Sequence, residues 1–228
     1  MARTYSSPLR AEQAQVTRRR ILDAARAQFL DGGWTGTTVK VIADGAAVAP
    51  ATVYAVFGTK RAVLSTLIDE TLASALPDPD HPDAWPEIVG HPDQRERARR
   101  LVALVSEALP RVAPLERVVR EGAGADEEIA GLAHDLLQWR RATAARMVDV
   151  LAGEDGLRPG LARGEAADLL FALGGPEVHH LLVEIRGWSP ERFDAHVADL
   201  LGRLIGSTTQ KQALSSRRAP RQGSDPRT

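Results

Sequence analysis

Apolar residues recur at helical spacing through most of this chain, and this periodicity limits its possible folds more than any other feature. Ile21, Ala25 and Phe29 lie four positions apart and place an apolar stripe along one face of a helix. No stretch alternates between apolar and polar residues, so the sequence predicts no strand. Ala, Leu and Arg are abundant, and all three enter helices at little cost. We therefore expect an all-α protein.

Glycines and prolines divide this pattern into separate helices. A first helix is expected from about Gln13 to Leu30, where Gly32 and Gly33 stop it. Five prolines exclude a regular helix through residues 77–93, and Pro110 and Pro114 separate two later helices. The helices expected after the first are near 38–46, 50–57, 59–76, 94–109, 115–121, 126–152, 164–173, 176–186 and 190–205.

Charge is distributed unevenly along the chain. Residues 1–61 contain nine Lys or Arg and four Asp or Glu, a net charge of +5, whereas the whole chain has a net charge of −1. The tail at 207–228 is also basic, so the region between them is acidic. A basic N-terminal segment on an acidic body indicates a module that binds a polyanion. Arg18, Arg19 and Arg20 are expected on a solvated helix face.

The stretch from Ile21 to Leu64 has the layout of a helix-turn-helix, with two short helices around a tight break and a helix on either side. The third helix would lie in the major groove of DNA while Val53 and Phe57 face the core. Its exposed residues would be Pro50, Ala51, Thr52 and Ala55.

Three further side chains are placed to hold the DNA backbone. The hydroxyl of Tyr54 can donate to a phosphate, although Tyr54 could instead cap the core of the small domain. Thr38, at the start of the second helix, can bind a phosphate together with free helix N–H groups. Lys60, at the start of the fourth helix, adds a cation.

The same stretch resembles the TetR family of bacterial transcription regulators over about 45 residues. The C-terminal run from Gly187 to Phe193 also resembles a segment that precedes the last helix in many members. The resemblance implies a ligand-responsive repressor that binds an inverted-repeat DNA operator as a homodimer, and it places Lys40 where members reach a base edge. The matching residues are Ile21, Leu22, Ala24, Ala25, Phe29, Gly33, Trp34, Thr37, Thr38, Val39, Ile42, Ala43, Val48, Thr52, Val53, Tyr54, Phe57 and Lys60.

The sequence departs from the family pattern at two positions near the turn. Ala47 stands where members often have Gly, and Ala49 stands where they often have a Ser or Thr that caps the third helix. The exposed face of the third helix also has few hydrogen-bond donors, with Thr52 the main one. We therefore expect contacts with thymine methyl groups and readout of DNA shape to outweigh bidentate base recognition.

These observations predict an N-terminal three-helix helix-turn-helix domain and a larger helical domain for ligand binding and dimerisation. Residues 1–12 are expected to be disordered, 13–61 to bind DNA, 62–206 to form the larger domain, and 207–228 to be a disordered basic tail. Apolar stripes predict a dimer interface formed by Leu170, Leu181, Leu182, Ile185, Phe193, Val197, Leu200, Leu201 and Leu204. Two interpretations stay open for a further set of residues, which either line a pocket for a largely apolar effector or simply pack the larger domain: Leu104, His134, Gln138, Trp139, Thr143, Met147 and Phe171.

Other classes of protein find little support in the sequence. Cysteine is absent, which excludes disulfides and thiolate sites, and no catalytic or nucleotide-binding motif occurs. We expect no enzyme activity, cofactor, metal site or membrane span, and a cytoplasmic location. Two alternatives stay open: a constitutive DNA-binding protein without a ligand, and a helical small-molecule-binding protein with a vestigial DNA-binding head.

Overall fold

The computed structural model describes residues 8–77, 85–153 and 156–205. These three ranges form helices and connecting segments without a β-strand, so the predicted all-α class is confirmed. The chain divides into two compact units that do not follow chain order. Unit 1 contains Met1–Asp78 and Leu104–Arg140, and unit 2 contains Pro79–Ala103 and Arg141–Thr228.

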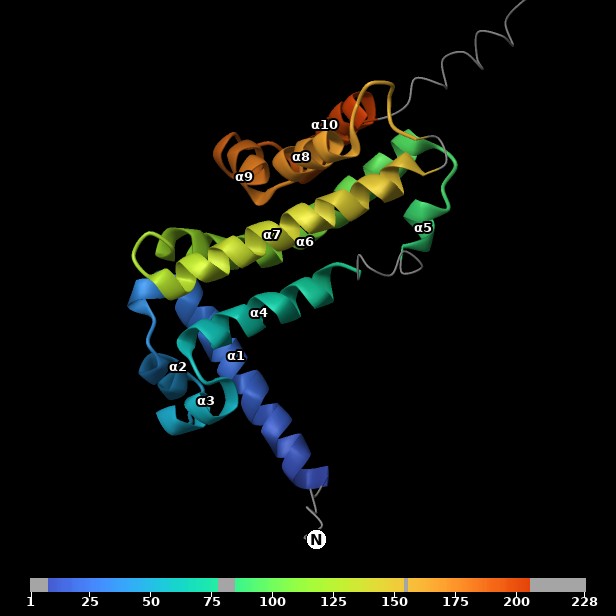
Figure 1. Cartoon of the computed structure of the whole chain (residues 1–228). Coiled ribbons are helices and arrows are strands. Elements are labelled where there is room, and N and C mark those ends of the chain that lie inside the picture. The colour runs from blue at the N-terminus through green and yellow to red at the C-terminus, as the bar shows by residue number, and fades with distance from the viewer. Residues whose placement is uncertain (1–7, 78–84, 154–155, 206–228) are drawn as a thin grey trace, which may run out of the picture. The chain divides into compact units, whose positions relative to one another are not determined.

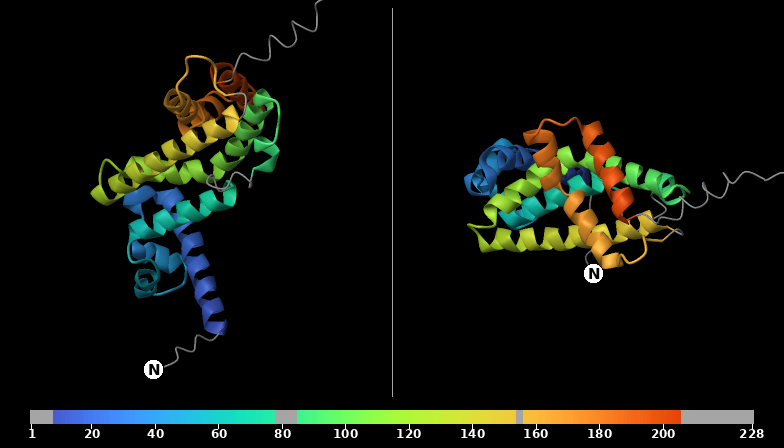
Figure 2. Two further views of the ribbon diagram at one scale, coloured as in Figure 1. Left: turned by 45° about the vertical axis from the view of Figure 1, so that its right-hand side comes forward. Right: turned by 90° about the horizontal axis from the view of Figure 1, so that it is seen from above.

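Unit 1 brings the N-terminal helices together with parts of two long helices (Figure 1). The N-terminal helices are α1 (Pro8–Gly36), α2 (Val39–Gly45), α3 (Pro50–Phe57) and α4 (Lys60–Ala75). The long helices are α6 (Gln94–Gly122) and α7 (Glu127–Ala152), which belong to unit 1 from Leu104 onward and up to Arg140, respectively. In Figures 1 and 2, α2 and α3 lie beside α1, toward the end of unit 1 from which α1 starts.

One apolar core joins all six of these helices. The helices that the sequence assigns to DNA binding therefore share their core with α6 and α7, instead of closing around a core of their own. The functional division at residues 61 and 62 stays a prediction. Representative buried members, one or two from each helix, are Ile21, Phe29, Ile42, Val53, Leu64, Ile68, Leu115 and Ile129.

The first helix starts earlier than the sequence predicts. α1 begins at Pro8, so the expectation that residues 8–12 are unstructured is wrong, whereas residues 1–7 lie outside the described part. Proline suits the first helical position, because its missing N–H has no partner there. The regular part of α1 ends at Gly33, as predicted, where φ is 63° and ψ is −167°.

The predicted break at Pro110 and Pro114 is also wrong, because α6 runs through both residues. An interior proline removes a backbone hydrogen bond and costs about 3 kcal/mol in a helix. Leu109, Val112 and Leu115 are buried around these positions. Burial of this apolar face offsets the lost hydrogen bonds and keeps the helix continuous.

Unit 2 contains the start of α6, the end of α7 and a group of shorter helices. In the proline-rich segment, α5 (Pro86–Val89) forms a single helical turn that the sequence did not predict. Pro86 takes the first position of this turn, as Pro8 does in α1. Trp85 and Ile88 are buried. The helix expected over 176–186 is α9 (Pro176–His179) followed by η2 (His180–Ile185), a π-helical turn. The last helix, α10 (Pro190–Ile205), packs against α8 (Arg163–Leu173) and η2. The predicted tail at 207–228 lies outside the described residues.

The end of α6 approaches α1 so closely that it requires glycine. A Cβ atom built on Gly122 would lie 2.7 Å from Cβ of Trp34, whereas one on Gly124 would meet nothing within 4 Å. We expect Gly122→Ala to lower the free energy of unfolding by about 1–3 kcal/mol, because the Trp34 side chain has to move.

Thermal unfolding measures this effect, at about 2–4 °C of Tm for each kcal/mol. Gly124→Ala is the matched control and should leave the Tm within about 2 °C of the wild-type value. Equal melting of the two variants would contradict the close packing of α6 on Trp34.

Candidate nucleic-acid interface

The α2–turn–α3 segment has the geometry of a helix-turn-helix. The two helix axes are bent by 106° at the break between them. Ile42, Ala43 and Val53 turn into the core and fix both helices against the rest of unit 1. α2 begins as predicted: Thr38 is its N-cap, and Oγ1 of Thr38 accepts a hydrogen bond from the N–H of Val41 at 3.2 Å.

The turn itself contains a strained residue. Ala47 has a φ of 52°, in the left-handed region that favours glycine. The sequence identified this position as a departure from the family pattern, and the structure shows its physical consequence. The turn holds a left-handed backbone conformation that the Cβ atom of alanine disfavours.

The outer face of α3 is small, apolar and uncharged. Pro50, Ala51, Tyr54 and Ala55 are exposed, while Thr52 is half-buried. Tyr54 is 54% exposed, so it does not cap the core. This face contains no Lys or Arg. The surface can therefore approach closely a partner that presents methyl groups and phosphates along a groove.

The two predicted contacts on α2 are both accessible. Thr38 is exposed at the start of the helix. Lys40 is exposed as well, and its Nζ donates to Oδ2 of Asp44 at 2.7 Å, one helical turn later. This hydrogen bond raises the pKa of Lys40, and the ammonium stays charged at neutral pH. An exposed i, i+4 pair of this kind is weak and leaves the lysine available to another anion.

Lys60 lies differently from the other predicted contacts. Its side chain is half-buried, and its Nζ donates to the backbone oxygens of Trp34 at 2.9 Å and Thr37 at 3.0 Å. The same ammonium stands 3.8 Å from the centre of the Trp34 ring. Burial lowers the pKa of Lys60, against the opposing effect of Asp126 and Glu128.

Trp34 joins the end of α1 to the start of α7, a role that sequence reasoning missed. Its Nε1 donates to Oδ2 of Asp126 at 2.9 Å, and this bond lowers the pKa of Asp126. The Trp34 ring also stacks on Phe29, with 6.1 Å between ring centres. The pair Gly33–Trp34 was visible as a family match, but the partner on α7 lies 92 positions away and has no signal in the sequence.

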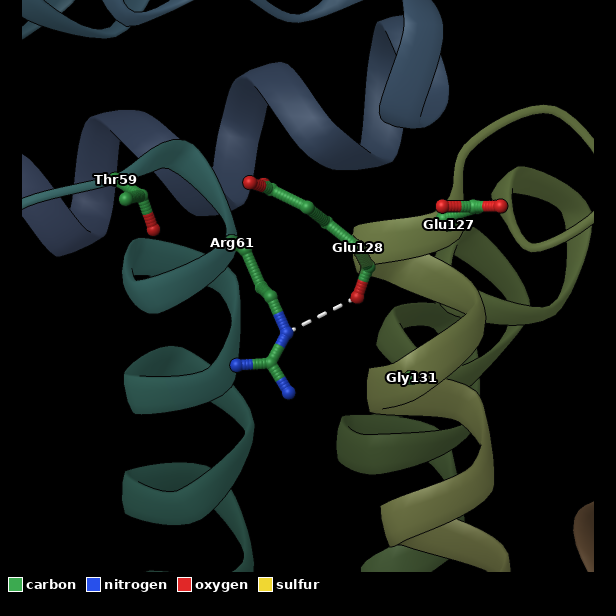
Figure 3. A pocket seen from close by; sticks show the side chains of 5 residues that line it. All are labelled: Thr59, Arg61, Glu127, Glu128 and Gly131. Carbon is green, nitrogen blue, oxygen red and sulfur yellow. Dashed lines mark hydrogen bonds between the residues drawn. The ribbon is translucent and has the colours of Figure 1, made fainter.

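Arg61 forms a second connection between α4 and α7 (Figure 3). Its Nε donates to the backbone oxygen of Glu128 at 3.0 Å, and its Nη2 donates to Oδ2 of Asp135 at 3.1 Å. Arg61 and its neighbours line an open pocket of about 400 Å³. The lining residues are Thr59, Arg61, Glu127, Glu128 and Gly131.

Several other cations of the basic N-terminal segment also contact groups within unit 1. Arg18 pairs with Glu70 and covers the Phe57 ring, and Arg26 donates to Oγ1 of Thr71 at 2.9 Å. Arg19 and Arg20 are exposed, as expected for a solvated face. The net charge of +5 therefore overstates the cations that face a partner, because part of it binds carboxylates and carbonyls of the protein itself.

The predicted dimer residues fall into two groups in unit 2. Leu170, Phe193, Val197 and Leu201 are buried, so these four pack the core of the unit. Leu181, Ile185 and Leu200 are 56%, 65% and 41% exposed, and Leu182 is half-buried. The side chain of Leu204 lies outside the described residues.

The predicted effector residues are also divided. In unit 1, Leu104 and Trp139 are half-buried, while His134 and Gln138 are exposed on α7. In unit 2, Thr143 and Met147 are buried on α7, and Phe171 is half-buried on α8. None of these seven residues lines the pocket at Arg61.

In the ranges 8–77, 85–153 and 156–205, no three His, Cys, Asp or Glu side chains gather as metal ligands would. No single helix in that part is long and apolar enough to cross a membrane, and α2 with α3 reaches the length and hydropathy only across its 106° bend.

Comparison with known proteins shows which solved proteins share this fold. Residues 21–67 match the family described as bacterial regulatory proteins, tetR family. The fold is that of solved TetR-family regulators. A search of curated proteins finds no match. The chain thus has a helix-turn-helix fold like that of these regulators, and its residues 21–67 match the tetR family.

Three solved structures illustrate the likeness. NalD, the secondary repressor of the MexAB-OprM multidrug efflux pump in Pseudomonas aeruginosa, is 20% identical; the match covers 84% of this chain and 98% of NalD, with a TM-score of 0.64. The regulator FadR from Bacillus subtilis, solved with stearoyl-CoA, is 18% identical over 80% of this chain and 96% of its own, with a TM-score of 0.63. The fatty acid degradation regulator FadR from Bacillus halodurans is 19% identical over 87% and 96%, with a TM-score of 0.64.

The strained turn gives a direct test of the local structure. We expect Ala47→Gly to raise the free energy of unfolding by about 0.5–1 kcal/mol, because relief of the left-handed strain exceeds the entropy that glycine loses on folding. Ala46 is the matched control: its φ is −83°, and its side chain is buried. Ala46→Gly should therefore lower the stability measured by thermal or urea unfolding. Destabilisation by Ala47→Gly would contradict the conformation of the turn.

Proposed function

We propose that this protein is a ligand-responsive transcriptional repressor that binds a palindromic DNA operator as a homodimer. The observation that supports DNA binding most directly is the exposed outer face of α3, held by buried Val53 next to a correctly capped α2. The family match over residues 21–67 supports the same function. Helix-turn-helix proteins insert the second helix of the motif into the major groove.

The chemistry of this face predicts how the operator is recognised. Ala51, Ala55 and Pro50 offer apolar contact to thymine methyl groups, and Thr52 offers a hydroxyl to a base edge. Tyr54 and Thr38 bind phosphates on either side and set the register of the helix without reading sequence. We therefore expect much of the specificity to come from DNA shape.

The homodimer is proposed from the exposed apolar side chains of unit 2. Leu181 and Ile185 lie four positions apart in η2, nearly one turn of a π-helix, and Leu200 projects from α10, which packs against η2. Exposed leucine and isoleucine side chains of this size favour burial against a second copy. A two-fold dimer would also hold two α3 helices about 34–36 Å apart, as an inverted repeat requires.

The effector is proposed to be largely apolar. Thr143 and Met147 are buried on α7 in unit 2, and Phe171 is half-buried on α8, a set that combines a flexible thioether, an aromatic ring and one hydroxyl. One fold relative, FadR of Bacillus subtilis, was solved with stearoyl-CoA. Binding of such a ligand and binding of DNA would favour different conformations, and the coupling between them is reciprocal.

DNA binding is tested by selecting bound fragments of genomic DNA and then measuring fluorescence anisotropy. We expect an inverted repeat to be enriched, with an affinity that falls steeply with salt concentration as counterions are released. Tyr54→Phe should lower affinity about tenfold on every sequence, because one phosphate hydrogen bond is lost. Thr52→Ala should change the preferred sequence and leave random DNA unaffected. Equal losses on operator and random DNA for Thr52→Ala would contradict its role in readout.

The homodimer is tested by light scattering after size-exclusion chromatography. The wild-type protein should have twice the 24.6 kDa mass of the chain at micromolar concentration. Replacing both Leu181 and Ile185 with Glu should yield monomers, because a buried carboxylate without a partner is strongly disfavoured. Leu137, which is 48% exposed on α7, supplies the control: Leu137→Glu should remain dimeric. A wild-type monomer would rule out the proposed dimer.

A further inference from the structure

The ammonium group of Lys60 is half-buried and contacts three groups within unit 1. It donates to the backbone oxygens of Trp34 and Thr37, at 2.9 Å and 3.0 Å, and lies 3.8 Å from the centre of the Trp34 ring. Trp34 lies among the last residues of α1, after the break at Gly33, and Thr37 lies between α1 and α2. Lys60 itself is the first residue of α4, so its side chain ties the start of α4 to the end of α1.

This position suits a cation for reasons that are independent of DNA. The last carbonyl groups of a helix have no partner within the helix, and they carry the negative end of its dipole. Trp34 directly follows Gly33, where the regular part of α1 ends, and the face of its indole ring attracts a positive charge. Burial lowers the pKa of Lys60, as expected for an ammonium that has exchanged water for protein partners.

The segment that Lys60 holds leads directly into the DNA-facing surface. Thr37 is buried, and its Oγ1 lies within hydrogen-bond distance of the backbone oxygens of Gln28 and Gly33. Its own backbone oxygen accepts from Lys60, so both the side chain and the backbone of Thr37 are held. The next residue, Thr38, is the N-cap of α2 and the proposed phosphate ligand. A displacement of Thr37 would therefore move the start of α2.

We infer that Lys60 is a positioning residue, which holds the segment from Trp34 to Thr38 against α4 and so sets the N-terminus of α2, instead of binding a DNA phosphate itself. The part of this inference that concerns DNA rests on the proposed function. A phosphate would have to compete with the two carbonyl oxygens and the Trp34 ring for the three N–H groups of the ammonium.

The neighbouring cation supports this assignment. Arg61 also turns into the protein, where it donates to the backbone oxygen of Glu128 and to the carboxylate of Asp135. Both cations at the start of α4 thus connect α4 to other helices of unit 1. Lys40, by contrast, is exposed on α2, where it pairs with Asp44, an exposed residue one helical turn later.

The first experiment needs no DNA. Amide hydrogen exchange of the full chain should show at least tenfold faster exchange in residues 34–41 of Lys60→Met, because the segment loses its hydrogen-bonded anchor. Lys60→Gln, whose amide can still donate to a carbonyl, should lie between that variant and wild type and serves as the second variant if Lys60→Met folds poorly. Lys40→Met removes an exposed charge and should leave exchange in residues 34–38 unchanged. Wild-type exchange in both Lys60 variants would overturn the inference.

The second experiment measures operator affinity against salt concentration. Loss of a phosphate contact reduces the slope of log K against log salt by about 0.9 for each contact. We expect Lys60→Met to bind about tenfold more weakly with the wild-type slope, because the phosphate contacts are displaced but not removed. A reduced slope would show that Lys60 binds phosphate, and unchanged affinity would show a role in stability alone; either result overturns the inference. If the wild-type protein bound no DNA, the proposed function would fail, whereas the exchange experiment would still decide whether Lys60 holds this segment.

Discussion

The apolar core that α1 shares with α4, α6 and α7 is the constraint on which the arrangement of unit 1 depends. Residues 13–61 contain most of α1 and two short helices, α2 and α3, which are only about two turns long. Helices of that length are unstable by themselves and require packing partners. Ile21 and Phe29 of α1 and Leu64 and Ile68 of α4 are fully buried in a cluster that also contains Leu115 of α6 and Ile129 of α7. The helix-turn-helix formed by α2 and α3 is therefore held in place by helices from a distant part of the sequence.

Polar contacts at the edge of this core determine its finer geometry. Trp34 buries its ring against Phe29, donates to Asp126 at the start of α7, and offers its carbonyl oxygen to Lys60. Arg61 adds a connection from α4 to α7. Each of these groups has its hydrogen-bonding partner within unit 1, so the ends of α1, α4 and α7 are fixed relative to one another.

The same contacts explain why the charge of the N-terminal segment is a poor guide to its binding surface. A net charge of +5 over residues 1–61 suggests a strongly cationic face, but Arg18, Arg26, Lys60 and Arg61 all bind other parts of unit 1. The outer face of α3 is left with small apolar residues, a tyrosine and a threonine. Recognition by such a face depends on close approach and on backbone contacts more than on a cluster of cations.

The sequence by itself determined the helical class, the bounds of α2, α3 and α4 to within about two residues, and the cap at Thr38. The class and the bounds follow from the local spacing of apolar residues. The cap follows from a side chain that lies next to the backbone N–H that it satisfies. It also identified Ala47 as an unusual residue for its turn, which the φ of 52° explains. Tertiary packing decided the rest. It kept α6 helical through Pro110 and Pro114, and it buried Phe193, Val197 and Leu201 in unit 2 while leaving Leu181 and Ile185 exposed. It also turned Lys60 toward Trp34, since the partners of a long side chain are set by residues that are far away in the sequence.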